Sequence, residues 1–200
     1  MPYSDFTLKK VKEQLHLKLV ENQDLFSVIT EIGISDYLST TLKYNVPLAL
    51  AVGTEKFRSE LIIANILLEV RRVLKDEISL FSGVNLDIDK QKDLNGFCDF
   101  VISKSPEQYY LNAPIIAVVE AKNEYIAGGL GQCIAEMFAS HLFNEKEGIS
   151  LRIYGAVTTG NTWKFLKYEA GVAYIDVPEY HIANAGKILG ILVSMVNQEA

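Results

Sequence analysis

The strongest helical pattern in the chain runs from Glu55 to about Asp76 and follows Thr54, a residue type that favours a helix N-cap. Apolar residues fill most of this segment, and its polar residues form one stripe through spacings of 7, 4, 3 and 4. We predict a helix packed into the body of the protein, with the stripe in solvent and Glu60 on the inward side. The stripe comprises Arg58, Asn65, Glu69, Arg72 and Asp76.

Three strand patterns follow this helix. Residues 78–87 alternate between apolar and polar positions, and residues 97–103 come after Asn95-Gly96, a turn signal that predicts a hairpin. Residues 114–119 form a continuous apolar run that is typical of a central strand covered on both faces.

The remaining segments predict more helices and strands. The alternation and the helical spacing in residues 8–20 leave helix and strand both open, and residues 34–43 predict a short helix that Tyr44-Asn45-Val46-Pro47 ends. Together the segments predict one α/β domain with a mixed sheet, covering residues 1–200. After residue 120 we expect helices at 130–143 and 182–196, and strands at 151–158, 162–168 and 172–177.

Composition narrows the class of protein. Hydrophobic residues make up 49% of the chain and charged residues 22%, which excludes a disordered chain, collagen and a coiled coil. The longest run without Asp, Glu, Lys or Arg has 12 residues, whereas a membrane span needs about 20, and the first ten residues lack the apolar core of a secretory signal. Two cysteines, Cys98 and Cys133, cannot form a disulfide framework. We expect a soluble, reduced, cytoplasmic protein without a membrane partner.

Four ionisable residues stand where the pattern predicts an apolar interior. Asp99 lies in the middle of the second strand, and Glu120 and Lys122 share a face at the end of the central strand. Glu60 is the fourth. Burying a lone carboxylate costs several kcal/mol, ~2–7, unless it is paired or binds a metal, so their convergence points to a functional site.

Metal-assisted phosphodiester hydrolysis uses such a set. Asp99 and Glu120 are hard oxygen ligands suited to Mg²⁺, and the carbonyl of Ala121 is a candidate third ligand. A bound Mg²⁺ would lower the pKa of its water and stabilise charge on phosphate oxygens. Lys122 would neutralise the transition state or position the attacking water. A Glu and a Lys two apart at a strand end also form simple surface salt bridges, and that alternative stays open.

The spacing of Asp99 and Glu120-Ala121-Lys122, 21 positions apart, resembles the PD-(D/E)XK nuclease superfamily, which has the restriction-endonuclease-like fold. The wider sequence is similar to uncharacterised bacterial members, notably cyanobacterial ones. The resemblance implies a core of helix, three strands, helix and strand over residues 55–158. It also implies an acidic residue in the first core helix, which Glu60 matches as a further metal ligand or a water-positioning residue. A Gln that faces and supports the site is matched by Gln132. Cys98 stands where the superfamily's motif often has Pro.

The resemblance divides the chain around this core. Residues 1–50 would be an N-terminal extension packed on the core, and residues 159–200 would add a hairpin and a helix.

Glu124 and Glu136 are interpreted as surface or supporting residues rather than ligands.

The expected function is Mg²⁺-dependent hydrolysis of nucleic acid, with DNA the favoured substrate and Mn²⁺ a substitute ion. The net charge of −6 argues against a basic nucleic-acid surface over the whole chain. Two alternatives therefore stay open. One is a non-cleaving interaction module that keeps the fold, and the other is a nuclease whose basic surface comes from a partner subunit or from a homodimer.

Overall fold

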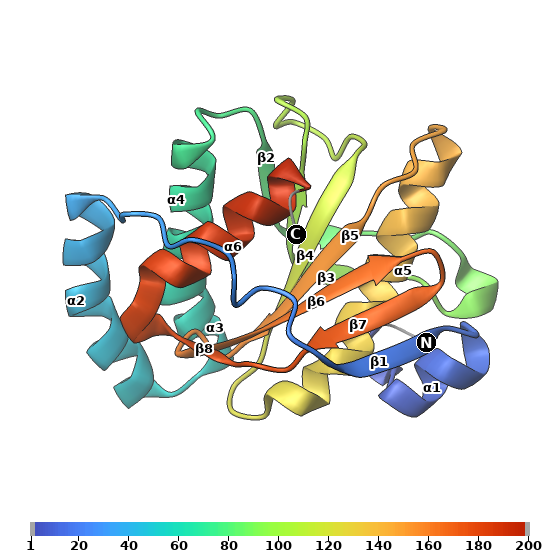
Figure 1. Cartoon of the computed structure of the whole chain (residues 1–200), viewed down its shortest axis with the longest axis horizontal. Helices are drawn as coiled ribbons and strands as arrows, with labels where there is room; N and C mark the ends of the chain where they lie inside the picture. The colour runs from blue at the N-terminus through green and yellow to red at the C-terminus, as the bar shows by residue number, and fades with distance from the viewer. Residues whose placement is uncertain (1–2, 199–200) are drawn as a thin grey trace.

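The computed structural model describes residues 3–198 and contains an α/β fold with an open, mostly antiparallel mixed sheet (Figure 1). This confirms the expected class and the mixed sheet. The strands are β1 (Lys18–Gln23), β2 (Ser79–Asn85), β3 (Phe97–Ser103), β4 (Ile115–Ala121), β5 (Ile153–Thr158), β6 (Thr162–Glu169), β7 (Val172–Asp176) and β8 (Tyr180–His181).

Strand order places β4 inside the sheet. Within the described residues the order is β1-β7-β6-β5-β4-β3-β2, and β8 pairs with β6. All seven residues of β4 are buried, as its continuous apolar run predicted. It pairs antiparallel with β3 and parallel with β5, so polar residues near its C-terminal end lie between two neighbouring strands.

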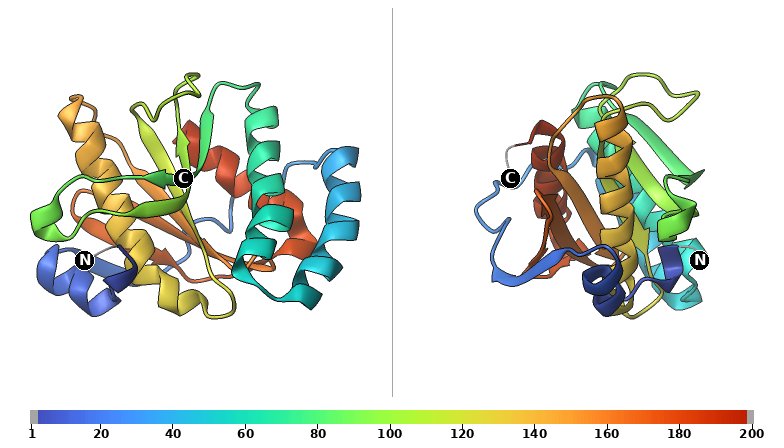
Figure 2. Two further views of the ribbon diagram at one scale, coloured as in Figure 1. Left: turned by 180° about the vertical axis from the view of Figure 1, so that it is seen from behind. Right: turned by 90° about the vertical axis from the view of Figure 1, so that its right-hand side faces the viewer.

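Helices cover both faces of the sheet (Figure 2). One apolar core lies between the sheet and α2, α4 and α6, and the other lies under α1 and α5. No helix in residues 3–198 combines the length and the apolarity that crossing a bilayer requires. The helices are α1 (Leu8–Gln14), α2 (Asp36–Val52), α3 (Glu55–Arg58), α4 (Ala64–Val73), α5 (Leu130–Lys146) and α6 (Ala185–Asn197).

The predicted helix at 55–76 forms, but its geometry changes partway. Thr54 caps it as expected, and its side chain accepts a hydrogen bond from the amide of Phe57. Between α3 and α4, Ser59–Ile63 is π-helical, which changes the rotation between successive residues. The predicted burial is wrong at two residues: Glu60, within the π-helical segment, is exposed, and Glu69, within the regular helix α4, is buried.

The prediction that α2 ends before Pro47 is also wrong. The helix begins after its N-cap Ser35 and continues through Pro47 to Gly53, which takes the left-handed conformation of a C-cap, with φ of 73°. Leu42 and Ala49 are buried on either side of the proline. Packing of these side chains offsets the hydrogen bond that proline cannot donate.

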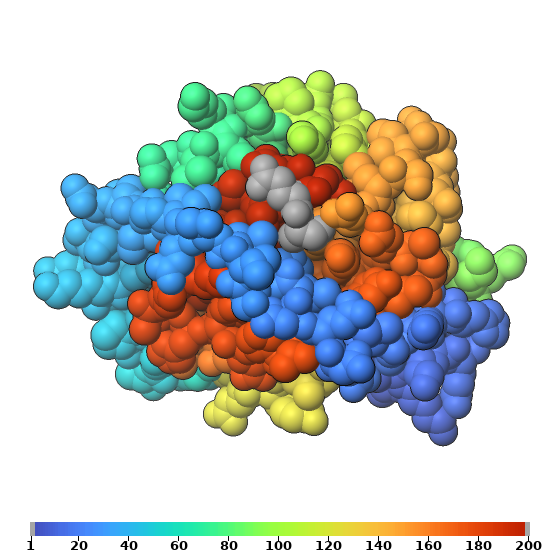
Figure 3. All heavy atoms as spheres, in the orientation of Figure 1, coloured from blue at the N-terminus to red at the C-terminus, as the bar shows by residue number. Residues whose placement is uncertain are grey.

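Residues 8–20, where the sequence left helix and strand both open, contain one of each: helix α1 is followed by strand β1. The segment after β1 then crosses over α6 on the face shown in Figure 3. The amide of Ile32 donates to the carbonyl of Gly186, and Lys187 Nζ donates to the carbonyl of Ser27. A Cβ atom at Gly190 would lie 2.2 Å from the carbonyl oxygen of Thr30, so this close crossing requires glycine.

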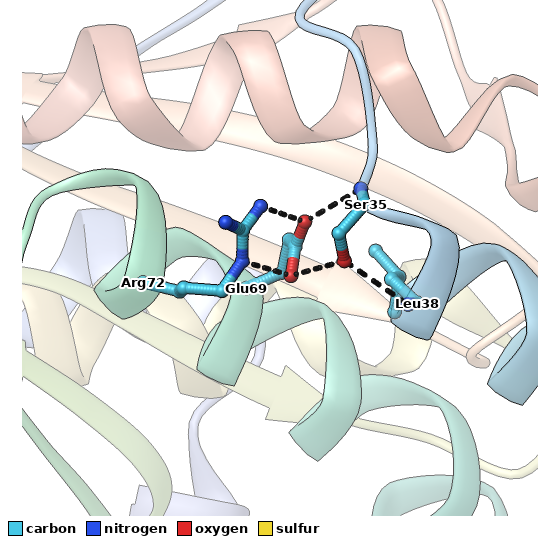
Figure 4. A network of polar contacts seen from close by, with 4 residues as sticks. All are labelled: Ser35, Leu38, Glu69 and Arg72. Atoms are coloured by element: carbon cyan, nitrogen blue, oxygen red, sulfur yellow. Dashed lines mark hydrogen bonds and ion pairs between the residues drawn. The ribbon is translucent and has the colours of Figure 1, made fainter.

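A buried carboxylate joins α2 to α4 (Figure 4). Glu69 of α4 is 3% exposed and accepts hydrogen bonds from the amide and the hydroxyl of Ser35. Arg72 donates two more, at 2.9 and 2.6 Å. The Ser35 hydroxyl in turn accepts from the amide of Leu38, so one network caps α2 and fixes it on α4.

Replacing Glu69 with Ala should lower the free energy of unfolding by about 1–3 kcal/mol at neutral pH, because it leaves the Ser35 donors unpaired. Hydrogen bonds from Arg72 lower the pKa of Glu69 from 4.5 to about 2. Its contribution is therefore complete above pH 4.5 and is lost as the pH falls towards 2. Urea unfolding across this range measures the difference. An equal loss in the control Glu77→Ala, which removes an exposed acid, would contradict the assignment.

Candidate functional site

A carboxylate is buried at the C-terminal end of the central strand. Glu120 is 2% exposed, and strand alternation places it on the same side as Val118, in the core under α5. Its Oε1 accepts a hydrogen bond from Lys122 Nζ at 2.5 Å. The Lys122 side chain is 23% exposed, and its amide donates to the carbonyl of Thr158 on β5. The ammonium is therefore held at the boundary between core and solvent.

Asp99 reaches the same place from β3. Phe100 pairs with Val119, so the antiparallel register, continued by one residue, brings Asp99 opposite Glu120. The Oδ2 atom of Asp99 accepts a hydrogen bond from the amide of Ala121 at 2.8 Å. The two carboxylate residues that the sequence predicted are thus neighbours across one strand pair. The ligand role of the Ala121 carbonyl stays a prediction.

Two side chains of α5 extend this cluster. Gln132 Oε1 accepts from Lys122 Nζ at 3.1 Å, and Gln132 Nε2 donates to Glu136 Oε1 at 3.0 Å. Gln132 therefore faces the cluster, as expected. Glu136 is fully buried, because α5 packs this side against β4 and β5, so of the two interpretations given for it, surface or supporting residue, only the supporting one agrees with its position. Glu124 is exposed, as expected.

The cluster holds more potential negative charge than positive charge. Burial, and next the charge of Asp99, raise the pKa of Glu120 to about 7. Burial and the charge of Glu120 raise the pKa of Glu136 well above its usual range. Burial opposes the charged form of Lys122, but the carboxylate of Glu120 outweighs it and raises the pKa of the ammonium. One ammonium at the solvent boundary does not compensate the carboxyl groups behind it.

A cleft of about 470 Å³ opens beside Asp99, between the helical segment from α3 to α4 and the β2–β3 pair. Glu60 lines it, but its side chain is 57% exposed and its Oε1 lies 3.9 Å from Lys56 Nζ. The prediction that Glu60 is buried is wrong, because its side chain lines an open cleft that solvent reaches. It nevertheless shares the cleft with Asp99. The apolar wall consists of Ala64, Leu68, Leu80 and Phe100.

Two carboxylates of the cluster suit a hard cation. The Oε2 atom of Glu120 is buried and has no hydrogen-bond partner among the described residues, and Asp99 lies beside it. Across residues 3–198 no group of three or more His, Cys, Asp or Glu side chains is arranged to hold one ion. Mg²⁺ keeps several waters and takes one or two protein carboxylates. The donor set therefore fits an Mg²⁺ ion bound by two carboxylates and water, rather than a closed protein cage.

Sequence reasoning missed two contributions to the cluster. The i, i+4 spacing of Gln132 and Glu136 on a predicted helix was a usable signal that their side chains meet. The second contribution is Gly129, where a Cβ would lie 2.7 Å from Val157 and 3.0 Å from Lys122. Its missing side chain gives the stem of Lys122 the space to pass.

Comparison of the chain with models of protein families, with curated proteins and with solved structures gives no match. The geometry of the cluster is therefore the basis for assigning a function.

The carboxyl group of Glu120 should titrate near pH 7 in metal-free protein, because burial raises its pKa. An acid whose folded pKa exceeds its unfolded value stabilises the folded state less as the pH rises, here between 4.5 and about 7. ¹³C NMR of the side-chain carboxyl groups, with Glu120→Gln as the assignment control, measures the midpoint. Asp99→Asn should lower it. A midpoint near 4.5 in the wild type would mean that water solvates this carboxylate.

Proposed function

We propose that the chain is a Mg²⁺-dependent nuclease that hydrolyses phosphodiester bonds in DNA at the cluster of Asp99, Glu120 and Lys122. The observation that carries this proposal is the buried Oε2 atom of Glu120, which lacks a hydrogen-bond partner among the described residues and lies next to a second carboxylate. A divalent cation bound there would favour the ionised form of carboxyl groups that one ammonium does not compensate and whose pKa burial raises. The order of helix, three strands, helix and strand across residues 55–158 supports a restriction-endonuclease-like core.

Each residue of the cluster has a role in this proposal. Asp99 and Glu120 would hold the ion, which would supply a more acidic water and charge stabilisation at the phosphate oxygens. Within the described residues, Glu120 and Gln132 engage two of the three N–H donors of Lys122, so one remains for a phosphate oxygen or for the attacking water. In the reaction, the water oxygen bonds to phosphorus and releases a proton to solvent, the bond from phosphorus to the leaving oxygen breaks, and that oxygen takes up a proton from solvent.

The cleft offers a route from solvent to Asp99, and Glu60 would help to orient water at its polar end. Its acidic lining also repels phosphate, because Glu55 and Glu60 outnumber Lys56 there. Binding of a polyanion therefore depends on the divalent ion, or on basic groups supplied by a partner.

A non-cleaving module is the second candidate, and one observation favours it. Lys122 and Glu120 form an ion pair at 2.5 Å, and that pair already satisfies one carboxylate oxygen. Basic residues of α4 are also engaged in ion pairs, since Arg72 pairs with Glu69 and Arg71 pairs with Asp76. Such a module would bind without turnover.

Wild-type protein should cleave single- or double-stranded DNA in Mg²⁺ or Mn²⁺ and should lose this activity in EDTA. Lys122→Ala, Asp99→Ala and Glu120→Ala should each lower kcat at least about 100-fold, because charge stabilisation in such sites contributes several kcal/mol. Lys9→Ala is the matched control, since it removes an exposed lysine that is paired only at the surface of α1.

The outcomes separate the candidates. Equal cleavage by all variants would overturn the assignment and indicate a contaminating nuclease. Intact binding of DNA without turnover would select the non-cleaving module. Light scattering in the same buffers separates a monomer from a homodimer that would contribute basic surface.

A further inference from the structure

Glu136 is the one carboxyl group of the described cluster to which the proposed reaction assigns no role. It is fully buried in α5, and its Oε2 atom has no hydrogen-bond partner among residues 3–198. Its Oε1 atom accepts from Gln132 Nε2, one helical turn earlier. Burying a carboxyl group is costly when its polar atoms are not all paired, so a hydrophobic residue would stabilise this position more simply.

The hydrogen bonds that link Lys122, Gln132 and Glu136 all run in one donor-to-acceptor direction. An ammonium only donates, so the side-chain amide of Gln132 must present its oxygen to Lys122. Its NH₂ group then points the other way and needs an acceptor. Glu136 Oε1 provides that acceptor at 3.0 Å, whereas a donor at this position would favour the flipped amide and repel the ammonium.

The helix backbone does not use this side chain. The backbone carbonyl of Glu136 accepts from the Ser140 hydroxyl, but that contact is independent of the carboxyl group. The nearby side chains include Cys98 and Cys133, both buried free cysteines. The interaction with Gln132 is thus the contact that distinguishes Glu136 from an apolar residue of the same size.

We propose that Glu136 is a positioning residue, which fixes the amide of Gln132 so that its oxygen holds the Lys122 ammonium next to Glu120. The role requires an acceptor oxygen and no charge. Its consequence for cleavage rests on the proposed nuclease function, but the position of Lys122 can be measured without any reaction.

Glu136→Gln keeps an acceptor oxygen toward Gln132, whereas Glu136→Leu keeps the volume and removes the acceptor. We expect kcat for DNA cleavage within about 2-fold of the wild type in Glu136→Gln, and a loss of about 10- to 100-fold with unchanged KM in Glu136→Leu. Met137→Leu, a buried substitution of similar volume on the same helix, should keep full activity. Circular dichroism and thermal unfolding establish that each variant is folded.

NMR tests the inference separately from the activity. The side-chain amide protons of Gln132 should exchange slowly in the wild type and in Glu136→Gln, and rapidly in Glu136→Leu. The ¹⁵N shift of the Lys122 ammonium should change only in Glu136→Leu. Unchanged spectra in Glu136→Leu would overturn the positioning role, as would loss of activity in Glu136→Gln equal to that in Glu136→Leu. Absence of cleavage by the wild type, with the expected spectra, would overturn the nuclease proposal alone.

Discussion

The burial of the Glu120 carboxyl group at the end of β4 is the constraint around which this end of the sheet is organised. The strand is central and covered on both faces, so water does not solvate the carboxylate from either side. Compensation must come from neighbours that the fold brings close. Lys122 supplies one hydrogen bond from the same strand end, and the remaining oxygen stays without a partner within residues 3–198.

Three separate segments meet at this point because of the strand order. The antiparallel pairing of β3 with β4 brings Asp99 beside Glu120, and the parallel neighbour β5 holds the backbone of Lys122. α5 crosses the same face and inserts Gln132 between the ammonium and a second buried acid. A polar cluster in such a setting is stable only when its hydrogen bonds are mutually consistent, since partly satisfied buried networks are costly.

Much of the sheet and most of the cluster could be predicted from local pattern. Alternation and apolar runs identified β2 to β7, and the two-residue period placed Glu120 and Lys122 on one side of a strand. The prediction of β4 succeeded because a central strand exposes no face, so its composition directly reflects burial, whereas β2 at the edge of the sheet was predicted from alternation.

The failures have a common physical origin, which is that helical phase depends on tertiary contacts. Glu60 lies in the π-helical segment Ser59–Ile63, whose hydrogen bonds span one residue more than those of an α-helix, and nothing in the residue types signals this change. Its side chain borders the same cleft as Asp99 but is exposed rather than buried. Glu69 was assigned to solvent because its binding partner, Ser35, lies 34 positions earlier in the chain. Pro47 remains inside α2 because packing of Leu42 and Ala49 outweighs a local preference.

The pairing of β1 with β7 has a consequence for biosynthesis. The paired residues Lys18 and Val172 are 154 positions apart in the sequence, because β1 lies near the N-terminus and β7 near the C-terminus. During translation, the first strand to leave the ribosome has no mate until nearly the whole polypeptide has followed. Until then its backbone amides are hydrogen-bonded to water, so the β1 edge of the sheet pairs late. A nascent chain stalled before residue 172 would leave β1 without its partner strand.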